Sequence, residues 1–301
     1  LNSALGDDVR LVGDLTVTAI ATETGASTTY STSNTGATNV LLTAADGNWS
    51  VATGALDTDL ENNIKYAGAL TVTGITGITN ETNALTDYTT AKTGATTNIL
   101  TASDTNWSLA ATTLTAALGA GVRFAGDLSV TAVSNEAAAL TAYTDLKTGA
   151  AKITLNASDA NWSIAAATLD TALSGKILLV GSLTVTDIAN DDETSALTAY
   201  KTAKTGATTN TLTATDGNWS VAATTLDTAL TAGVRLAGNL TVNGISTETT
   251  ASAKYSKTNT GATNVLLTAS DNNWSVTATN LNADISNSIK YAGALTVTGI
   301  S

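Results

Sequence analysis

Paired oxygen-bearing side chains recur at five places and are the clearest candidates for ion chemistry in this sequence. Each place has Asp and Asn two residues apart: Asp46 and Asn48, Asp104 and Asn106, Asp159 and Asn161, Asp216 and Asn218, Asp271 and Asn273. Calcium loops use oxygen ligands at this spacing, but their third acidic position and bidentate Glu are missing here. Asp and Asn also favour turns, because their side chains bond to nearby backbone amides. We therefore favour turn formation and keep calcium as the weaker alternative.

The same five places carry the triplet Asn-Trp-Ser, which fits the acceptor pattern for N-glycosylation. The acceptors would be Asn48, Asn106, Asn161, Asn218 and Asn273. The simpler interpretation is that Asn closes the turn, because the Trp beside it is expected to be at least partly buried. We favour this interpretation over modification.

Catalysis finds little support in the side chains. The chain contains no His and no Cys, so the commonest general base and the thiolate nucleophile are both missing. A Ser-Lys pair or paired carboxylates could still act, but the acidic residues recur with a repeat or occupy its loops. These residues are Asp57, Asp170, Asp227, Glu23, Glu81, Glu136 and Glu248. Equivalent positions in several copies indicate solvation or contacts, so we expect neither an enzyme nor a cofactor.

The positions of Trp divide the chain into five similar units. They are Trp49, Trp107, Trp162, Trp219 and Trp274, at steps of 58, 55, 57 and 55 residues. A Gly lies nineteen residues after each Trp, at Gly68, Gly126, Gly181, Gly238 and Gly293, and another lies thirteen residues before it in Thr-Gly-Ala. No insertion interrupts this span in any copy. We therefore expect each Trp, and the Gly after it, to be structural.

The repeats define the expected domain plan. Residues 1–35 are the tail of an incomplete repeat plus a connector, followed by repeats at 36–93, 94–148, 149–205 and 206–260 and by an incomplete fifth at 261–301. Units of this size bury little surface alone. We expect them to stack in one direction and to bury a continuous core. Incomplete repeats at both ends would favour head-to-tail or lateral association between copies of the chain.

Alternation of apolar and polar residues predicts one strand around the second Gly of each unit. The alternating stretches are 64–72, 122–130, 177–185, 234–242 and 289–297. A period of two over nine residues is typical of a strand with one buried face. The central Gly indicates a bend, a bulge or the close approach of another backbone.

The segment around each Trp has two interpretations. In the favoured one, a strand ends at the Asp-x-Asn turn and another begins at Trp, which together make a β-hairpin. In the rival one, a helix begins at Trp107 and its face carries Trp107, Ala111, Leu114 and Leu118. The favoured interpretation adds a short helix over 114–118 and a second before Tyr143.

These elements give each repeat about three strands and one or two short helices. The predicted class is mainly β, a β-rich chain of tandem repeats of about 55 residues that stack into an elongated rod. The alternative is an α/β solenoid in which short strands and helices alternate.

Short motifs link the repeats to known surface proteins. Asp-Gly-Asn-Trp-Ser-Val at 46–51 and 216–221, followed by a Leu-containing stretch, Gly and an alternating Thr/Val strand, resembles Ig-like tandem repeats of giant secreted bacterial adhesins and biofilm proteins. Leu-Thr-Val-Thr-Gly-Ile at 70–75 and 295–300 is similar to repeats of surface-layer and type I-secreted proteins. The resemblance implies a cell-surface location and a role in adhesion or assembly.

Composition narrows the function classes further. The net charge of −12 disfavours nucleic acid as a partner, because nucleic-acid binding needs clustered Lys and Arg. No apolar run reaches membrane-spanning length. We therefore expect an extracellular structural repeat protein, a subunit of a surface filament, sheath or surface layer. The alternative is a stalk or adhesive module of a long secreted adhesin that binds surface glycans, which would need exposed aromatic rings.

Overall fold

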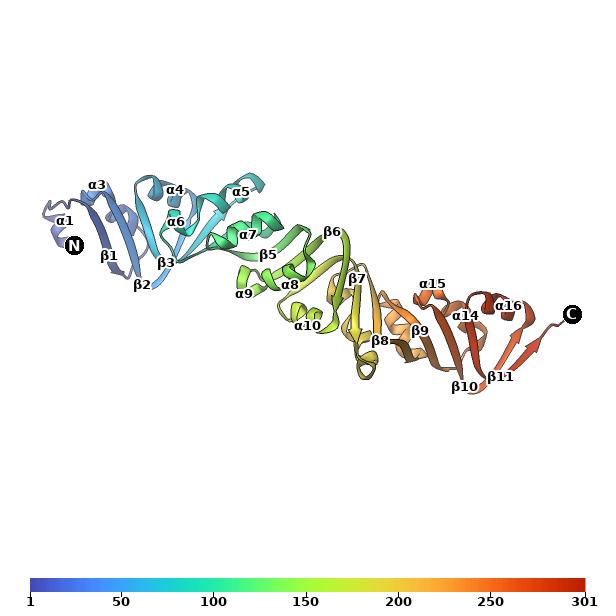
Figure 1. The fold of residues 1–301 in the computed structure, drawn as a ribbon. Helices are drawn as coiled ribbons and strands as arrows, with labels where there is room; N and C mark the ends of the chain where they lie inside the picture. The colour runs from blue at the N-terminus through green and yellow to red at the C-terminus, as the bar shows by residue number, and fades with distance from the viewer. Residues whose placement is uncertain (301) are drawn as a thin grey trace. The chain divides into compact units, whose positions relative to one another are not determined.

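The computed structural model describes residues 1–300, which form two compact units (Figure 1). The first unit contains Leu1–Ala132 and Ala142–Ile153, and the second contains Val133–Thr141 and the described residues from Thr154 onward. In both units, parallel strands alternate with helices. No helix within residues 1–300 is long and apolar enough to cross a membrane.

The first unit follows a regular order of elements. It comprises α1 (Asn2–Gly6), β1 (Asp14–Ile20), α2 (Ala26–Thr29), α3 (Thr32–Thr35), β2 (Asn39–Ala52), α4 (Thr53–Glu61), β3 (Ile64–Ile75), α5 (Ile78–Asp87), α6 (Thr90–Thr93), β4 (Thr97–Ala110), α7 (Ala111–Gly119), β5 (Val122–Val133) and α9 (Asp145–Thr148). The helices between strands are the crossovers that a parallel sheet requires.

The second unit repeats this order. It comprises α8 (Glu136–Ala142), β6 (Lys152–Ala165), α10 (Ala166–Ser174), β7 (Ile177–Ile188), the 3₁₀ turn η1 (Asn190–Asp192), α11 (Glu193–Ala199), α12 (Thr202–Thr205), β8 (Thr209–Ala222), α13 (Ala223–Thr231), β9 (Val234–Ile245), α14 (Glu248–Lys254), α15 (Lys257–Thr260), β10 (Asn264–Thr277), α16 (Ala278–Ser286) and β11 (Ile289–Thr298).

Within each unit, the strands pair in parallel with their neighbours in chain order. β2 pairs with β3 from Val40 to Thr43 and again from Asn48 to Ala52, and the chain bulges between these two stretches. The same interrupted pairing joins β4 to β5, β8 to β9 and β10 to β11. A uniform register therefore places equivalent residues of successive repeats in equivalent surroundings.

The prediction of a mainly β, β-rich fold with three strands per repeat is wrong, and the α/β alternative fits the structure. Residues 36–93 contain two strands and three helices, namely β2, α4, β3, α5 and α6. The predicted hairpin is the source of the error. The Asp46–Asn48 segment lies inside a continuous strand whose two halves pair with the same neighbour, so it bends the chain without reversing it.

Two of the predicted helices are present, and the rival helix is not. The short helix expected over 114–118 is present as the longer α7, and the helix expected before Tyr143 is α8. The rival helix starting at Trp107 is wrong, because Trp107 lies within β4 and pairs with Leu128 of β5. The alternating stretches after each Trp are confirmed as β3, β5, β7, β9 and β11.

The core lies between one face of the strands and the helices that cross over them, as α4 does over β2 and β3 (Figure 1). Leu42 and Trp49 on β2, Tyr66 and Leu70 on β3, and Leu56 on α4 are each 3% exposed or less. Burial of these apolar side chains holds the helix on the sheet, at about 25 cal/mol per Å² of apolar surface removed from water.

Candidate functional sites

The five Asp-x-Asn segments form the same side-chain-stabilised turn. In β4, the Asn106 backbone amide donates to Asp104 Oδ1 at 3.0 Å, and Asn106 Nδ2 donates to the Asp104 carbonyl at 2.7 Å. The residue between them, Thr105, has a left-handed φ of 60°. The other four copies make the same two bonds. One carboxylate oxygen of each Asp thus already serves the backbone.

The described chain has no cluster of the side chains that most often bind metals. Among residues 1–300, no three or more acidic, His or Cys side chains gather closely enough to hold a metal ion. The Asp and the Asn of each turn are both engaged in hydrogen bonds. Calcium at these turns stays a prediction.

The Gly nineteen residues after each Trp lies directly against the turn. At Gly126 the backbone has a φ of +97°, and an added Cβ would stand 2.1 Å from the Thr105 carbonyl oxygen. The remaining equivalents, Gly68, Gly181, Gly238 and Gly293, have φ values from 99° to 115° and the same contact at 2.2–2.3 Å. No larger residue fits there, because a Cβ essentially never approaches another heavy atom within 3.0 Å.

The five Trp side chains point into the core. Trp49, Trp107, Trp162, Trp219 and Trp274 are 2–3% exposed. Each indole Nε1 donates to the carbonyl of the residue eighteen positions on, at 3.0–3.2 Å. Trp107 also meets the Phe124 ring edge-on, with centroids 5.0 Å apart. Each Trp is therefore hydrogen-bonded to the next strand. Neither face of its ring is accessible for stacking on a sugar.

The Asn of each Asn-Trp-Ser triplet is exposed, and so is its Ser, whereas the Trp between them is buried. The Asn Nδ2, which is the atom that N-glycosylation modifies, donates to the carbonyl of the Asp before it in every copy. Modification would have to break this bond. Glycosylation at Asn48, Asn106, Asn161, Asn218 and Asn273 stays a prediction.

A contact that sequence reasoning missed joins the variable loop to the strand after the turn. The carboxylate of Glu193 accepts a hydrogen bond from the Ser220 backbone amide at 3.0 Å. Glu136 and Glu248 make the equivalent contacts at 3.2 and 3.4 Å, each 27 residues before the Ser. The constant spacing was the available signal: Glu136 and Glu248 were predicted to lie in the variable loop, with solvation or contacts as their role, whereas Glu193 was not among the predicted residues.

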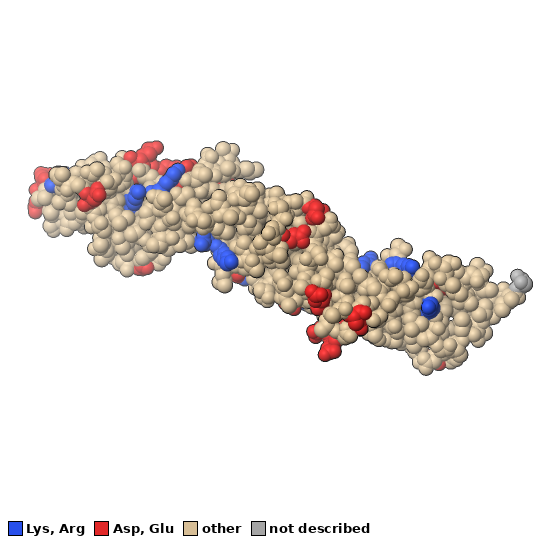
Figure 2. All heavy atoms as spheres, in the orientation of Figure 1, with Lys and Arg blue, Asp and Glu red and all other residues tan. Residues whose placement is uncertain are grey.

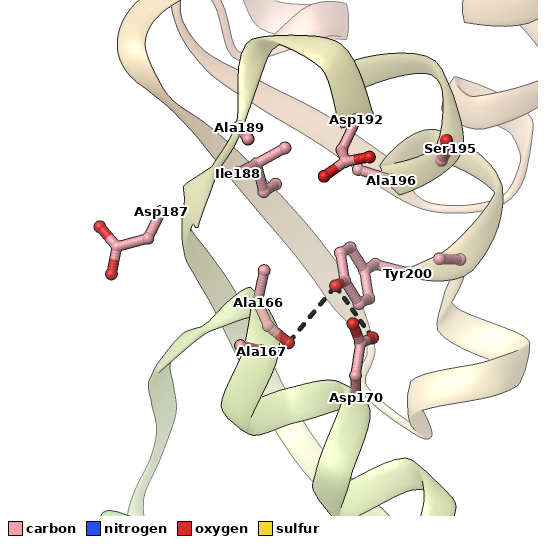
Figure 3. Close-up of a pocket in the computed structure, with 11 residues that line it drawn as sticks. Ala166, Ala167, Asp170, Asp187, Ile188, Ala189, Asp192, Ser195, Ala196 and Tyr200 are labelled. Atoms are coloured by element: carbon pink, nitrogen blue, oxygen red, sulfur yellow. Dashed lines mark hydrogen bonds between the residues drawn. The ribbon is translucent and has the colours of Figure 1, made fainter.

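A second missed feature is a Tyr that bonds to the crossover helix. Tyr200, at the end of α11, donates to Asp170 of α10 at 3.0 Å and to the Ala166 carbonyl at 3.4 Å (Figure 3). Tyr88 bonds to Asp57 at 2.8 Å and Tyr255 to Asp227 at 2.9 Å. In repeat 2 the acid is replaced, and Tyr143 bonds to Thr115 at 2.8 Å.

Burial is the main cause that raises the pKa of the Tyr200 hydroxyl, and the hydrogen bond from this hydroxyl to Asp170 raises it further. The negative charges of Asp170 and Asp192 act in the same direction. The Tyr88 and Tyr255 pKa values are raised for the same leading reasons. These tyrosines are therefore neutral hydrogen-bond donors at physiological pH.

Pockets open beside two of these Tyr–Asp pairs, at equivalent places in repeats 1 and 3. The one in repeat 3 has a volume of about 320 Å³ and lies between the start of α10, the end of β7 and α11. Asp170, Asp192 and Tyr200 line it together with Ala and Ile side chains, and Asp192 faces Tyr200 across the opening (Figure 3). The pocket in repeat 1 measures about 280 Å³ and includes Asp57 and Tyr88.

A different Tyr–Asp pair occurs in two of the repeats: it is buried in the first and only partly buried in the fifth. The Tyr66 hydroxyl donates to Asp59, and Tyr291 donates to Asp284. Repeats 2, 3 and 4 carry apolar pairs at these positions: Phe124 with Ala117, Leu179 with Ala172, and Leu236 with Ala229. The two positions therefore change together between repeats, either to Tyr with Asp or to two apolar residues.

Charged side chains are sparse on the face drawn in Figure 2, where most of the surface belongs to uncharged residues. No strong basic patch is visible on that face, which agrees with the excess of acidic over basic residues. The absence of nucleic acid as a partner stays a prediction from the net charge.

Comparison with known proteins adds no relative. No family model matches the chain, and neither the curated proteins nor the solved structures gave a match. The case for function therefore rests on the residues and contacts described above.

Proposed function

We propose that this chain is an extracellular structural repeat protein, a subunit of a surface filament, sheath or surface layer. The observation that carries the proposal is how its polar side chains are used. Asp closes turns, Trp bridges strands, Glu holds a backbone amide and Tyr braces a crossover helix, with the first two contacts present in every copy. Within residues 1–300, no buried side-chain nitrogen or oxygen lacks a partner.

The regular register supports a scaffold role. In the second unit, Leu183 of β7 pairs with Asn210 of β8, and Leu240 of β9 pairs with Val265 of β10 at the equivalent place. Repeat arrays gain stability from identical contacts between neighbours, so such a chain can be lengthened without redesign of any single unit. A protein that spans distance or covers a surface needs this property.

Association with further copies of the chain is part of the proposal. Leu295 on β11 is an apolar side chain that is 39% exposed, and we propose that it packs against another copy. Head-to-tail and lateral arrangements both satisfy the proposal.

The second candidate is a stalk or adhesive module of a long secreted adhesin, with surface glycans as ligands. The pockets of repeats 1 and 3 favour it, because a purely structural repeat does not need them. Glycan binding through the Trp rings is disfavoured by their burial. The two candidates share the extracellular location that the motif resemblance implies.

Sedimentation velocity over a hundredfold concentration range, with negative-stain images of the same samples, tests the proposal. We expect larger species to grow with concentration and to appear as filaments or sheets. Leu295→Asp should weaken this growth, and Leu146→Asp is the matched control, because Leu146 is already 92% exposed on α9. A monomer at every concentration would contradict the filament proposal and favour the adhesin module.

A further inference from the structure

The fourth repeat holds a cation where the third repeat has a pocket. In repeat 4, Lys254 Nζ lies 2.6 Å from Asp227 Oδ2 and 5.5 Å from the centroid of the Tyr255 ring. The Tyr255 hydroxyl donates to the other oxygen, Oδ1, of the same Asp. One carboxylate thus accepts a Tyr hydroxyl and an ammonium together, and the ring adds a cation–π contact.

Repeat 3 keeps the Asp and the Tyr but lacks the lysine. Asp170 corresponds to Asp227 and Tyr200 to Tyr255, and the Tyr200 hydroxyl donates to Asp170 Oδ1 in the same manner. Ala199, immediately before Tyr200, stands at the position of Lys254 and lines the pocket. The small side chain therefore leaves open a space that an ammonium occupies one repeat later.

We propose that the pocket of repeat 3 binds a primary alkylammonium group, as a lysine side chain of another chain or as a free diamine. Asp170 would hold the ammonium as Asp227 holds Lys254. Asp192 adds a second negative charge on the opposite side of the pocket, and Asp187 also lines the pocket, with its carboxylate turned outward (Figure 3). No Lys or Arg lines the pocket, so its own charges attract a cation.

The rest of the lining fits an alkyl chain. Ala166, Ala167, Ile188 and Ala196 border the pocket and would contact the methylene groups behind the ammonium. A lysine side chain is amphipathic in this way, with an apolar stem and a charged end. The site is open to solvent and its carboxylates are exposed, so we expect a dissociation constant on the order of 1 mM. This inference is independent of the proposed structural role.

Exchange of side chains between the two repeats provides the test. Backbone NMR shifts of the intact chain are followed during titration with 1,5-diaminopentane, with the tripeptide acetyl-Gly-Lys-Gly-amide, and with 1-pentanol as the uncharged control. The wild type should show saturable shifts around Asp170 and Ala199 with an amine and none with pentanol. Ala199→Lys, which fills the pocket with its own ammonium, should weaken amine binding at least tenfold.

The reciprocal variant should gain a site. Lys254→Ala should add a further set of saturable shifts around Asp227. Ala142→Lys in repeat 2 is the matched control, and it should leave amine binding around Asp170 unchanged, because Thr115 replaces the Asp in repeat 2. Binding of the tripeptide alone assigns the site to a protein lysine, and binding of the diamine alone assigns it to a free amine. Absence of saturable binding by either amine would overturn the proposal, and so would an Ala199→Lys variant that binds as the wild type does.

Discussion

Replacement of Gly126 by Ala tests the contact that shapes every repeat. Gly126 has a φ of +97°, and its missing Cβ would stand 2.1 Å from the Thr105 carbonyl oxygen. A side chain in such a strained conformation costs about 1–3 kcal/mol. A tolerable separation of at least 3.0 Å requires the two strands to part by roughly 0.9 Å in a tightly packed region, which adds about 1–3 kcal/mol. The two costs together lead us to expect that Gly126→Ala lowers the free energy of unfolding by about 2–6 kcal/mol.

Gly119→Ala is the matched control in the same repeat. Gly119 is the last residue of α7, has an ordinary helical φ, and has open space where a Cβ would go. Ala is a better helix former than Gly, so this change should raise the free energy of unfolding by up to about 1 kcal/mol.

Urea unfolding followed by amide hydrogen exchange in β4 and β5 is the appropriate assay, because repeat arrays can unfold in parts. The two variants should move the local free energy of opening in opposite directions. If Gly126→Ala stays within about 0.5 kcal/mol of the wild type, the close approach of these strands does not govern stability and the reasoning is refuted.

Three further predictions follow from the same contacts. Trp219→Ala should lower the free energy of unfolding by about 3–5 kcal/mol in a urea titration, because it empties a buried site, and a loss below about 1 kcal/mol would contradict that. Asp59→Ala should cost about 1–3 kcal/mol, because the buried Tyr66 hydroxyl loses its acceptor and keeps only its contact with Ser27. Adding Tyr66→Phe should restore most of this loss, because repeat 2 carries Ala and Phe at these positions; a double variant no more stable than the single one would refute this. Burial and contacts with Asp raise the pKa of several tyrosines in the folded state above the value in the unfolded state. The free energy of unfolding should therefore fall as the pH rises above about 10. A free energy of unfolding that stays constant from about pH 9 to 12 would contradict this prediction. The tyrosines concerned are Tyr66, Tyr88, Tyr200, Tyr255 and Tyr291.

The strands after each Trp were predictable because their burial is local. A strand with one face on the core alternates apolar and polar residues, and the stretch from Ile64 to Val72 does so without interruption. The helix before Tyr143 was predicted from Leu140, Tyr143 and Leu146 on one face, and α8 is present there. Leu140 and Tyr143 are buried, whereas Leu146 lies on the next helix, α9, and is 92% exposed.

The fold class was not predictable from such patterns, because the turn signal has two meanings. Asp104 and Asn106 form the hydrogen bonds typical of a chain reversal, yet they lie within β4. Whether a strand bends or reverses depends on what lies opposite, which here is Gly126 on the next strand. That partner is chosen by the crossover helix α7 and the parallel register, and both are non-local.

For the candidate sites, the residue types were predictable from the sequence, but the contacts between them were not. The residue types at the turns were visible in the sequence, and so was the regular recurrence of Tyr and Glu. The contact of Glu193 with the Ser220 amide, and that of Tyr200 with Asp170, depend on how the loop folds back over the sheet. Comparison between repeats was the one available signal: Lys254 appears beside a Tyr–Asp pair in a single copy, and Ala199 replaces it in another.

The central claim is that interchangeable repeats, and no single unique site, carry the function. Deletion of residues 206–260 tests it most directly, because the cut rejoins Thr205 to Gly261 and restores Thr-Gly-Ala at the junction. β7 would then meet β10 as it now meets β8. We predict a folded chain with unchanged circular dichroism per residue, native Trp fluorescence and the same concentration-dependent association as the full chain. An unfolded chain, or a folded one that no longer associates when the full chain does, would contradict the claim.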